Sequence, residues 1–266
     1  MDADGNIYKP PSFRDGTYRT SPKDIPLLSR IFPSLVFYPK TIFIVFRAAC
    51  KAKYSRYDYV DWCKSSHGIL NALEGVGIRV EITGTNHIRE VDGPCVFVAN
   101  HMSTLETFVL PVIVVPFKET TFAVKESLVR YPVFKHIMIS RDPIVLTRTK
   151  PREDLVTLLR EGTAKLKSGK SIIIFPQTTR RNYFDPKGFN SIGIKLARRA
   201  GVPVIPIALK TDAWGCGRIL KDFGKVDPSK KVCFAFGEPI RIKDRGNEEH
   251  KIIMDFIAAK LQEWKQ

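Results

Sequence analysis

Short apolar segments alternate with candidate helices from Gly77 to the end of the chain. This alternation restricts the fold more than any other feature, because strands and helices that take turns form a largely parallel sheet covered on both faces. We therefore predict an α/β fold with a mixed, largely parallel sheet flanked by helices. The expected strands lie at 79–83, 96–98, 121–124, 144–146, 172–175, 204–209 and 232–236, and the expected helices at 104–115, 126–135, 152–167, 189–200 and 248–264.

Three prolines lie in or beside the last two expected strands, namely Pro203, Pro206 and Pro239. Proline cannot donate a hydrogen bond to a neighbouring strand. These strands are therefore expected at a sheet edge or at a bulge.

The chain carries a strong positive charge. Lys and Arg together number 43 against 27 Asp and Glu, so the formal net charge is +16. Such an excess indicates an anionic partner, which is a nucleic acid, a membrane surface or a phosphorylated substrate. A nucleic-acid-binding domain would interleave aromatic and basic side chains on a strand face or carry a known motif, and this sequence has neither. We therefore expect no nucleic acid partner.

With 266 residues, the chain is long enough for one domain and a small appendage. We divide it into a polar arm at 1–29, a helical membrane-associating segment at 30–75 and an α/β domain at 76–266. The arm has no basic start followed by an apolar core, so it does not resemble a secretory signal, and we expect it to be loosely held. The five cysteines are odd in number and widely spaced, which favours reduced thiols in a cytosolic compartment.

The segment 31–46 is the most apolar and aromatic part of the chain. Spanning a bilayer takes about 20 apolar residues, whereas Pro39 and Lys40 interrupt this run and Arg47 closes it. Flanking cations suit anionic head groups. We favour a helix, or a broken pair of helices with 56–74, that lies in the membrane interface at the cytoplasmic face. A core helix and a membrane-spanning helix are the alternatives.

A histidine and a glutamate lie where an expected strand gives way to an expected helix, in Asn-His-Met-Ser-Thr-Leu-Glu at 100–106. Sites in α/β proteins form at the carboxyl ends of strands. His101 is suited to take a proton near neutral pH. A carboxylate that accepts from its other ring nitrogen fixes the tautomer, as the acid does in a Ser-His-Asp triad. We predict that Glu106 is this carboxylate.

Glu106 also has a structural interpretation, because Ser103 to Glu106 has the S-x-x-E pattern of a capping box. Positions five apart on a continuous helix are about 140° apart around its axis. His101 and Glu106 therefore meet only if His101 precedes the helix and Glu106 lies in its first turn. A capping box produces this arrangement, so the two roles are compatible.

Further polar side chains follow other expected strands. Arg148 follows one of them, and Gln177, Thr179 and Arg180 follow another. Hydroxyl, amide and guanidinium groups in one loop suit a phosphate, since Arg binds phosphate with two parallel hydrogen bonds. The apolar segment 201–207 is a candidate wall of a pocket. Each feature has a structural alternative, because arginines after strands often face water and apolar runs are often core strands.

The order of these segments resembles the four-block pattern of the glycerolipid acyltransferase superfamily, in particular the 1-acylglycerol-3-phosphate acyltransferases. The blocks are N-H-x-x-x-x-acid at 100–106, a strand ending in Arg148, F-P-x-x-T-R at 175–180 and V-P-V-I-P-I at 202–207. The resemblance runs from about residue 77 to residue 240, including the connecting helices.

The sequence departs from the family pattern at several positions. Glu106 stands where most members have Asp, which keeps the carboxylate on a longer stem. Gln177 and Thr178 replace the Glu and Gly of F-P-E-G-T-R, and Gln177 can hydrogen-bond a hydroxyl but cannot carry charge. In the second block only Arg148 clearly carries over. These departures bear on the identity of the acceptor more than on the type of reaction.

The resemblance implies an O-acyltransferase that moves a fatty acyl group from acyl-CoA or acyl-carrier protein to the free hydroxyl of a lysophospholipid. The favoured acceptor is 1-acylglycerol-3-phosphate, which gives phosphatidic acid. His101 and Glu106 would form the general-base pair, and no metal or cofactor is implied. The implied substrate-binding residues are Lys125, Arg148, Gln177, Thr179 and Arg180. The alternatives are another lyso-lipid acceptor, or a catalytically weak lipid-binding or membrane-adaptor protein of the same fold.

Overall fold

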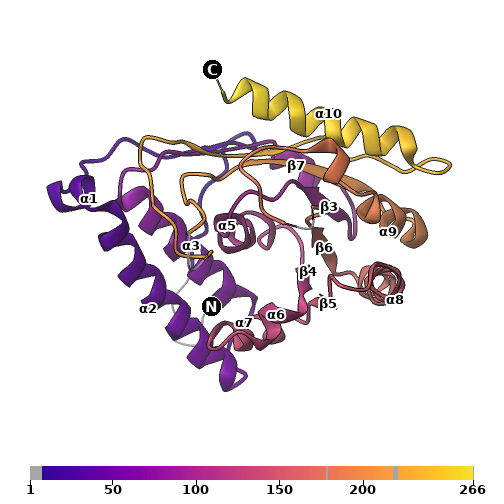
Figure 1. The fold of residues 1–266 in the computed structure, drawn as a ribbon, viewed down its shortest axis with the longest axis horizontal. Helices are drawn as coiled ribbons and strands as arrows, with labels where there is room; N and C mark the ends of the chain where they lie inside the picture. Colours follow the sequence, from indigo (N-terminus) through magenta and orange to yellow (C-terminus); the bar gives the residue numbers. More distant parts are fainter. Residues whose placement is uncertain (1–7, 178, 218–220, 266) are drawn as a thin grey trace.

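The computed structural model describes residues 8–177, 179–217 and 221–265. The arm expected at 1–29 is therefore described only from residue 8, and Thr178 of the third block lies outside the described residues. Figure 1 shows a curved sheet that separates two groups of helices.

The sheet has eight strands in the described ranges, in the order β1-β2-β8-β7-β3-β6-β4-β5. Every pair from β7 to β5 is parallel, β8 is antiparallel to β7, β2 is parallel to β8, and β1 is antiparallel to β2. The predicted mixed, largely parallel sheet is thus confirmed. The strands are β1 Tyr18–Arg19, β2 Val80–Thr83, β3 Val96–Ala99, β4 Thr120–Lys125, β5 Ile144–Leu146, β6 Ser171–Ile174, β7 Val204–Lys210 and β8 Val232–Phe236.

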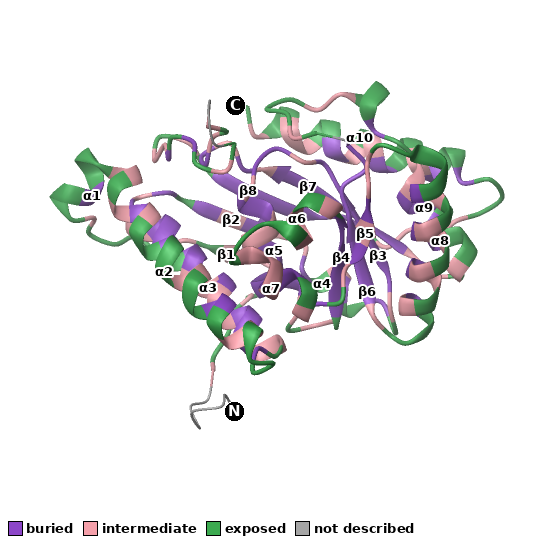
Figure 2. Cartoon of the chain, turned by 60° about the horizontal axis from the view of Figure 1, so that its bottom comes forward, coloured by how far each residue is buried: buried purple, intermediate pink, exposed green. Residues whose placement is uncertain are grey.

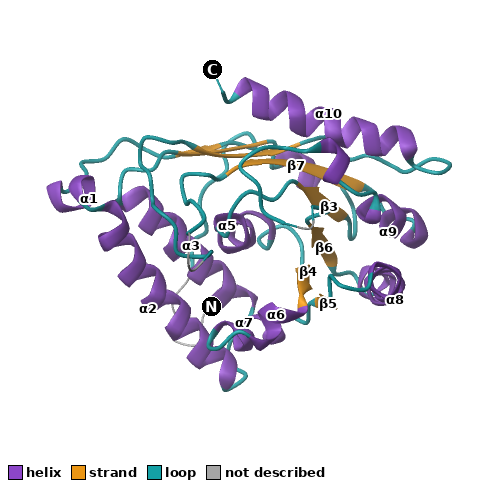
Figure 3. Cartoon of the chain, viewed as in Figure 1, coloured by secondary structure: helices purple, strands orange, loops and turns teal. Residues whose placement is uncertain are grey.

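Helices cover both faces of the sheet (Figure 3). On one face lie α1 Leu27–Ile31, α2 Pro33–Lys53, α3 Tyr59–Gly75, α5 Leu105–Val114, α6 Glu126–Arg130 and α7 Phe134–Ser140. On the other face lie α8 Pro151–Lys167, α9 Ile192–Ala200 and α10 Asn247–Glu263. The short α4 Asn86–Arg89 and a 3₁₀ turn at Pro186–Gly188 lie in connections.

Strand β3 shows why a core forms on each side of the sheet. Phe97 and Ala99 point into the core shared with α2, α3 and α5, whereas Val96 and Val98 point into the core shared with α8, α9 and α10. Successive side chains of a strand point to opposite faces. All four residues are buried, and the central strands are uniformly purple in Figure 2. A continuous apolar run is typical of a parallel strand covered on both sides.

The segment expected as an appendage, 30–75, shares a core with the α/β domain. Phe37, Ala48 and Ala49 of α2 are buried in the same cluster as the residues of α3 and α5. Helix α2 continues through Pro39, and α3 follows it as a second helix. The other side of α2 exposes large apolar side chains, which are Leu35, Ile42, Phe43 and Phe46.

The N-terminal arm is held more firmly than expected at residues 17–20. Strand β1 pairs with β2, so the arm adds the outermost strand of the sheet. The hydroxyls of Tyr18 and Thr20 donate to Glu74 Oε1 at 2.7 and 2.6 Å. This buried carboxylate needs donors, and the arm supplies them.

The expectation of an edge strand or a bulge is met at Pro206 by a bulge, whereas one expected helix limit is wrong. Pro206 lies in β7, which is a central strand. The pairing is interrupted after Ile207 and Phe236 and resumes at Val204 and Ile240, so two residues of β7 oppose three residues after β8. Pro206 lies at this bulge, where its missing N–H is tolerated, and Gly237 N–H donates to Pro206 O at 2.9 Å. The helix expected at 126–135 is divided into α6 and α7 by a break that contains Pro132, since proline removes a helical hydrogen bond.

No helix in the described ranges is both long enough and apolar enough to cross a bilayer. All five cysteines lie in these ranges and are free thiols. The apolar segment 201–207 enters β7, whose residues point into the two cores, so it is a core strand and not a pocket wall.

We predict that Gly84→Ala destabilises the fold more than Gly93→Ala. Both glycines have a positive φ, +76° and +75°, which costs a substituted alanine about 1–2 kcal/mol. A Cβ at Gly84 would also lie 2.1 Å from Phe236 O, whereas a Cβ at Gly93 would meet nothing within 4 Å. This clash should add about 1–3 kcal/mol to the loss in the free energy of unfolding. Urea denaturation of both variants measures the difference, and equal losses would contradict the close approach of Gly84 to the backbone of Phe236.

Candidate active site

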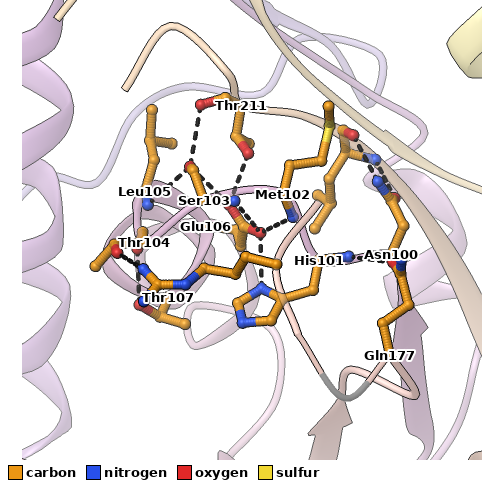
Figure 4. A network of polar contacts seen from close by, with 12 residues as sticks. Asn100, His101, Met102, Ser103, Thr104, Leu105, Glu106, Thr107, Gln177 and Thr211 are labelled. Atoms are coloured by element: carbon orange, nitrogen blue, oxygen red, sulfur yellow. Dashed lines mark hydrogen bonds and ion pairs between the residues drawn. The ribbon is translucent and has the colours of Figure 1, made fainter. Parts of the chain in front are cut away.

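The carboxyl ends of the parallel strands bring polar residues together at one edge of the sheet (Figure 4). His101 follows β3, Gln177 follows β6 and Thr211 follows β7, and β3 lies between the other two strands. Neighbouring strands are about 4.8 Å apart, so these residues meet although they are far apart in the sequence.

His101 and Glu106 form a hydrogen-bonded pair. The ring nitrogen Nδ1 of His101 lies 2.9 Å from Oε1 of Glu106. Helix α5 begins at Leu105, so His101 precedes the helix and Glu106 lies in its first turn. The Glu106 side chain is fully buried, whereas that of His101 is 20% exposed. The pair thus joins a buried carboxylate to a ring that reaches the surface.

Glu106 accepts hydrogen bonds from both sides of its carboxylate (Figure 4). Oε1 accepts from the backbone N–H groups of Met102 and Ser103 at 2.7 and 3.0 Å, in addition to His101. Oε2 accepts from the hydroxyls of Ser103 and Thr211 at 3.0 and 2.7 Å. The bond from Ser103 N–H to Glu106 is one half of a capping box, whereas Ser103 Oγ accepts from Leu105 N–H at 3.1 Å and Thr104 is the N-cap residue. Glu106 therefore both ties the loop before α5 and orients His101.

The environment keeps Glu106 ionised. Burial acts to raise the pKa of Glu106, but the hydrogen bond and charge of His101 and the hydrogen bond from Thr211 lower it further than burial raises it. The net effect is a pKa below the ordinary value for glutamate. An ionised carboxylate only accepts, so the proton between the two residues belongs to Nδ1 of His101. When the His101 ring is neutral, its lone pair is then on Nε2.

The second ring nitrogen of His101 is the one available for chemistry. Among the described residues, none hydrogen-bonds Nε2. The imidazole stacks on Phe175, with ring centroids 4.4 Å apart and an angle of 19° between the planes. This contact and the Glu106 bond fix the ring, so that Nε2 can accept a proton from a bound hydroxyl.

Two amide side chains hold the backbone around His101. Asn100 donates to Leu209 O and accepts from Leu209 N–H, both at 2.8 Å, which ties the end of β3 to β7. Gln177 accepts from the His101 N–H at 2.7 Å and is buried. The amide oxygen of Gln177 therefore already has a partner in the protein, and its proposed contact with substrate stays a prediction.

The two predicted arginines have different surroundings. Arg148 has a φ of +63°, and its backbone N–H and that of Thr147 donate to Asp154 at 2.8 and 2.7 Å. No hydrogen bond or ion pair joins its guanidinium to a described residue, and burial lowers the pKa of Arg148 although Asp154 opposes the shift. Arg180 instead forms an ion pair with Asp222 at 2.7 Å.

The remaining predicted residues lie at the same edge of the sheet. Lys125 is the last residue of β4 and Thr179 follows β6, and both side chains are exposed. The edge thus combines a histidine–glutamate pair with cationic and hydroxyl side chains. Such a site can remove a proton from a hydroxyl and hold an anionic group.

Sequence reasoning missed several residues that build this site. Thr211 and Asp222 bind Glu106 and Arg180 across 105 and 42 positions of chain, whereas Asp154 binds the backbone of Arg148 from six positions away. Thr211 carried a usable signal, because a hydroxyl directly after an apolar strand resembles the other site positions. Asp222 lies in a long connection between β7 and β8, and nothing local marks it.

Known proteins resemble this chain in sequence and in fold. Residues 79–210 match the family described as Acyltransferase. A 1-acyl-sn-glycerol-3-phosphate acyltransferase of Pseudomonas aeruginosa is 34% identical over 156 residues, which are 58% of this chain and 58% of that protein. A chloroplastic 1-acyl-sn-glycerol-3-phosphate acyltransferase of Brassica napus is 30% identical over 53% of this chain and 39% of that protein. The chain thus spans less than two thirds of the length of each of these relatives.

A solved structure extends the likeness in fold beyond this region. The crystal structure of the 1-acyl-sn-glycerophosphate (LPA) acyltransferase PlsC from Thermotoga maritima superposes with a TM-score of 0.65. The superposition covers 90% of this chain and 97% of that one, at 22% sequence identity. This chain is therefore an α/β protein whose sheet carries a histidine–carboxylate pair at one edge. By the family match, residues 79–210, which contain the four predicted blocks, belong to the acyltransferase family.

Proposed function

We propose that this protein is an O-acyltransferase that moves a fatty acyl group from an acyl thioester to the free hydroxyl of a lysophospholipid. The favoured acceptor is 1-acylglycerol-3-phosphate, and the donor is acyl-CoA or acyl-carrier protein. The observation that carries the proposal is the 2.9 Å contact between His101 Nδ1 and the buried Glu106 carboxylate, in a chain whose residues 79–210 match the acyltransferase family.

The pair supports a direct acyl transfer. Nε2 of His101 takes the proton from the acceptor hydroxyl as its oxygen attacks the thioester carbonyl. Glu106 stabilises the imidazolium that forms, because its carboxylate is ionised and holds the Nδ1 proton. Collapse of the tetrahedral intermediate breaks the carbon–sulfur bond. The imidazolium then returns its proton to the leaving thiolate, which gives the ester and the free thiol.

The cationic residues are assigned to the phosphate of the acceptor. Arg180 follows β6, the neighbour of the strand that precedes His101, and Arg148 follows β5, which is three strands away, roughly 14 Å at the sheet edge. The guanidinium of Arg148 is half-buried without a partner among the described residues, which suits an anion. Its backbone lies in the left-handed region, a strain often found at binding sites.

A small apolar cavity lies close to the start of helix α5. It has a volume of about 20 Å³ and lies between α2, α3, α5 and α7. Its lining includes Trp62, Phe108, Phe134 and Ile137, and Phe108 lies two residues after Glu106 on α5. The apolar lining suits an acyl chain, but a volume of about 20 Å³ holds only a water-sized group, so these helices must move apart for a chain to enter.

We assign membrane association to the outer side of α1 and α2. Phe43 and Phe46 are 66% and 57% exposed, and Leu35 and Ile42 are exposed beside them. Large apolar side chains gathered on one surface favour a membrane or protein interface. The net charge of +16 would attract anionic lipid. We therefore propose a peripheral, monotopic enzyme at the cytoplasmic face of a membrane.

Replacing Glu106 with Gln should abolish most turnover while the fold is kept. The amide oxygen can still accept from Met102 and Ser103 N–H, and the hydroxyls of Ser103 and Thr211 can reverse to accept from the amide nitrogen. The free energy of unfolding should fall by only about 1–2 kcal/mol. Turnover of acyl-CoA and lysophosphatidic acid should fall by roughly a hundredfold or more, because the imidazolium is no longer stabilised.

The chain offers a matched control for this variant. His87 and Glu90 form a similar pair at 3.0 Å on the surface, so Glu90→Gln removes an equivalent carboxylate far from the proposed chemistry. His101→Ala should be at least as damaging as Glu106→Gln, and the double variant should lose little more. Normal turnover by Glu106→Gln would reduce Glu106 to a helix cap.

Replacing Arg148 or Arg180 with Ala should raise the KM for the acceptor and leave the KM for the donor nearly unchanged. The reason is that a charge-assisted contact to the acceptor phosphate is lost, which should cost at least tenfold. Arg181→Ala removes the same charge from the next position, where the side chain instead bonds Tyr183 and Asp185. If the arginine variants changed the donor KM instead, these residues would serve the thioester donor.

Replacing Phe43 and Phe46 together with Glu should weaken binding to anionic phospholipid vesicles at least tenfold. Burying an apolar side chain of this size contributes about 1.5–3 kcal/mol, and the new charges also repel the lipid. The control is the replacement of Val156 and Ile252 with Glu, because both side chains are exposed, on α8 and α10 of the opposite face. This control adds the same two negative charges as the Phe43 and Phe46 variant. Vesicle cosedimentation measures the effect, and equal binding by the two double variants would disprove the assigned surface.

A further inference from the structure

The guanidinium of Arg180 is held on one side only. Its Nη1 donates to Asp222 Oδ1 at 2.7 Å and to the hydroxyl of Thr104. The Thr104 hydroxyl donates to the same oxygen of Asp222 at 2.7 Å. Among the residues described, none accepts from Nε or Nη2 of Arg180. These two nitrogens share one edge of the guanidinium, the edge that binds a phosphate with two parallel hydrogen bonds.

Thr104 connects this arrangement to the catalytic pair. It precedes the first residue of α5, three positions after His101 and two before Glu106. The backbone also joins the two sites, because Arg181 N–H donates to His101 O at 3.0 Å. The position of Arg180 relative to His101 is therefore fixed in two ways, by the contacts of the Arg180 side chain and by the backbone bond of Arg181.

Asp222 is itself held in place by helices α2 and α5. The indole N–H of Trp214 donates to Asp222 O at 3.1 Å, and the Trp214 ring stacks on Phe108 of α5. Two residues after Asp222, Gly224 O accepts from the hydroxyl of Tyr38 of α2. The carboxylate thus projects from a segment that is bound to two helices of the core, so it can hold Arg180 in one position.

We propose that Asp222 is a positioning residue for the phosphate of the acceptor and acts through Arg180. This inference rests on the proposed function and adds to it the residue that orients the phosphate-binding guanidinium. An arginine side chain loses much rotamer freedom when it becomes ordered. Asp222 and Thr104 remove that freedom before the acceptor arrives and leave Nε and Nη2 for the phosphate.

The opposite role for Asp222 is a carboxylate that competes with the acceptor. A competing carboxylate would occupy the phosphate-binding edge and neutralise it. Asp222 contacts Nη1 alone, and it shares that nitrogen with Thr104. The geometry therefore favours positioning, and the two roles predict opposite changes in the acceptor KM.

The test measures acyl transfer by the full-length protein with acyl-CoA and 1-acylglycerol-3-phosphate. Asp222→Ala should raise the acceptor KM about tenfold, with kcat and the donor KM changed less than about twofold. Asp222→Asn keeps an oxygen that accepts from Nη1 and should show a smaller increase. Asp227→Ala is the matched control, because Asp227 lies in the same connection and its carboxylate bonds Ser229 alone among the described residues. It should behave as the parent.

A double-variant comparison separates positioning from a general loss of structure. In an Arg180→Ala background, Asp222→Ala should change the acceptor KM less than about twofold, because its effect requires the guanidinium. Equal effects of Asp222→Ala in both backgrounds would overturn the proposal. An unchanged or lower acceptor KM in the single variants Asp222→Ala and Asp222→Asn would also overturn it, and a lower value would identify a competing carboxylate.

The same data distinguish this inference from the proposed function. If Arg180→Ala alone leaves the acceptor KM unchanged, the assignment of Arg180 to the acceptor is wrong. If Arg180→Ala raises the acceptor KM and Asp222→Ala does not, only the role of Asp222 is wrong.

Discussion

The buried carboxylate of Glu106 is the group on which the arrangement of the site depends. A charge without solvent costs several kcal/mol unless hydrogen bonds replace the water. Glu106 obtains them from the loop after β3, from the ring of His101 and from Thr211 after β7. Its position therefore sets the end of β3, the start of α5 and the end of β7 together. The helix cap and the orientation of His101 are two results of the same set of bonds.

The parallel strands provide the frame in which these bonds form. Strands β6 and β7 flank β3, so loops that are distant in the sequence meet beside His101. The N-terminal helices belong to the same frame, since α2 and α3 share a core with α5. Tyr38 of α2 also reaches the connection that carries Asp222. The exposed apolar surface of α2 is thus physically joined to the segment around the proposed acceptor site.

Most of the secondary structure could be predicted because its signals are local. A central strand such as β3 is apolar along its whole length, since both of its faces are covered. Local signals failed where a contact from elsewhere outweighed them. Pro206 is accommodated in a central strand because it lies at a bulge, where the antiparallel pairing is interrupted before it resumes at Val204 and Ile240. Residues 17–20 join the sheet because Glu74 accepts from Tyr18 and Thr20.

The sequence by itself determined the α/β class, the position of His101 before a helix, and Glu106 as the carboxylate within reach of it. These follow from periodicity and from the spacing of a capping box, which act over a few residues. Only the tertiary structure decided what surrounds the pair. Thr211, Gln177 and Asp222 approach His101, Glu106 or Arg180 across 42 to 105 positions of chain. Such contacts depend on strand order and on the paths of connections, and no local pattern of residues encodes either of them.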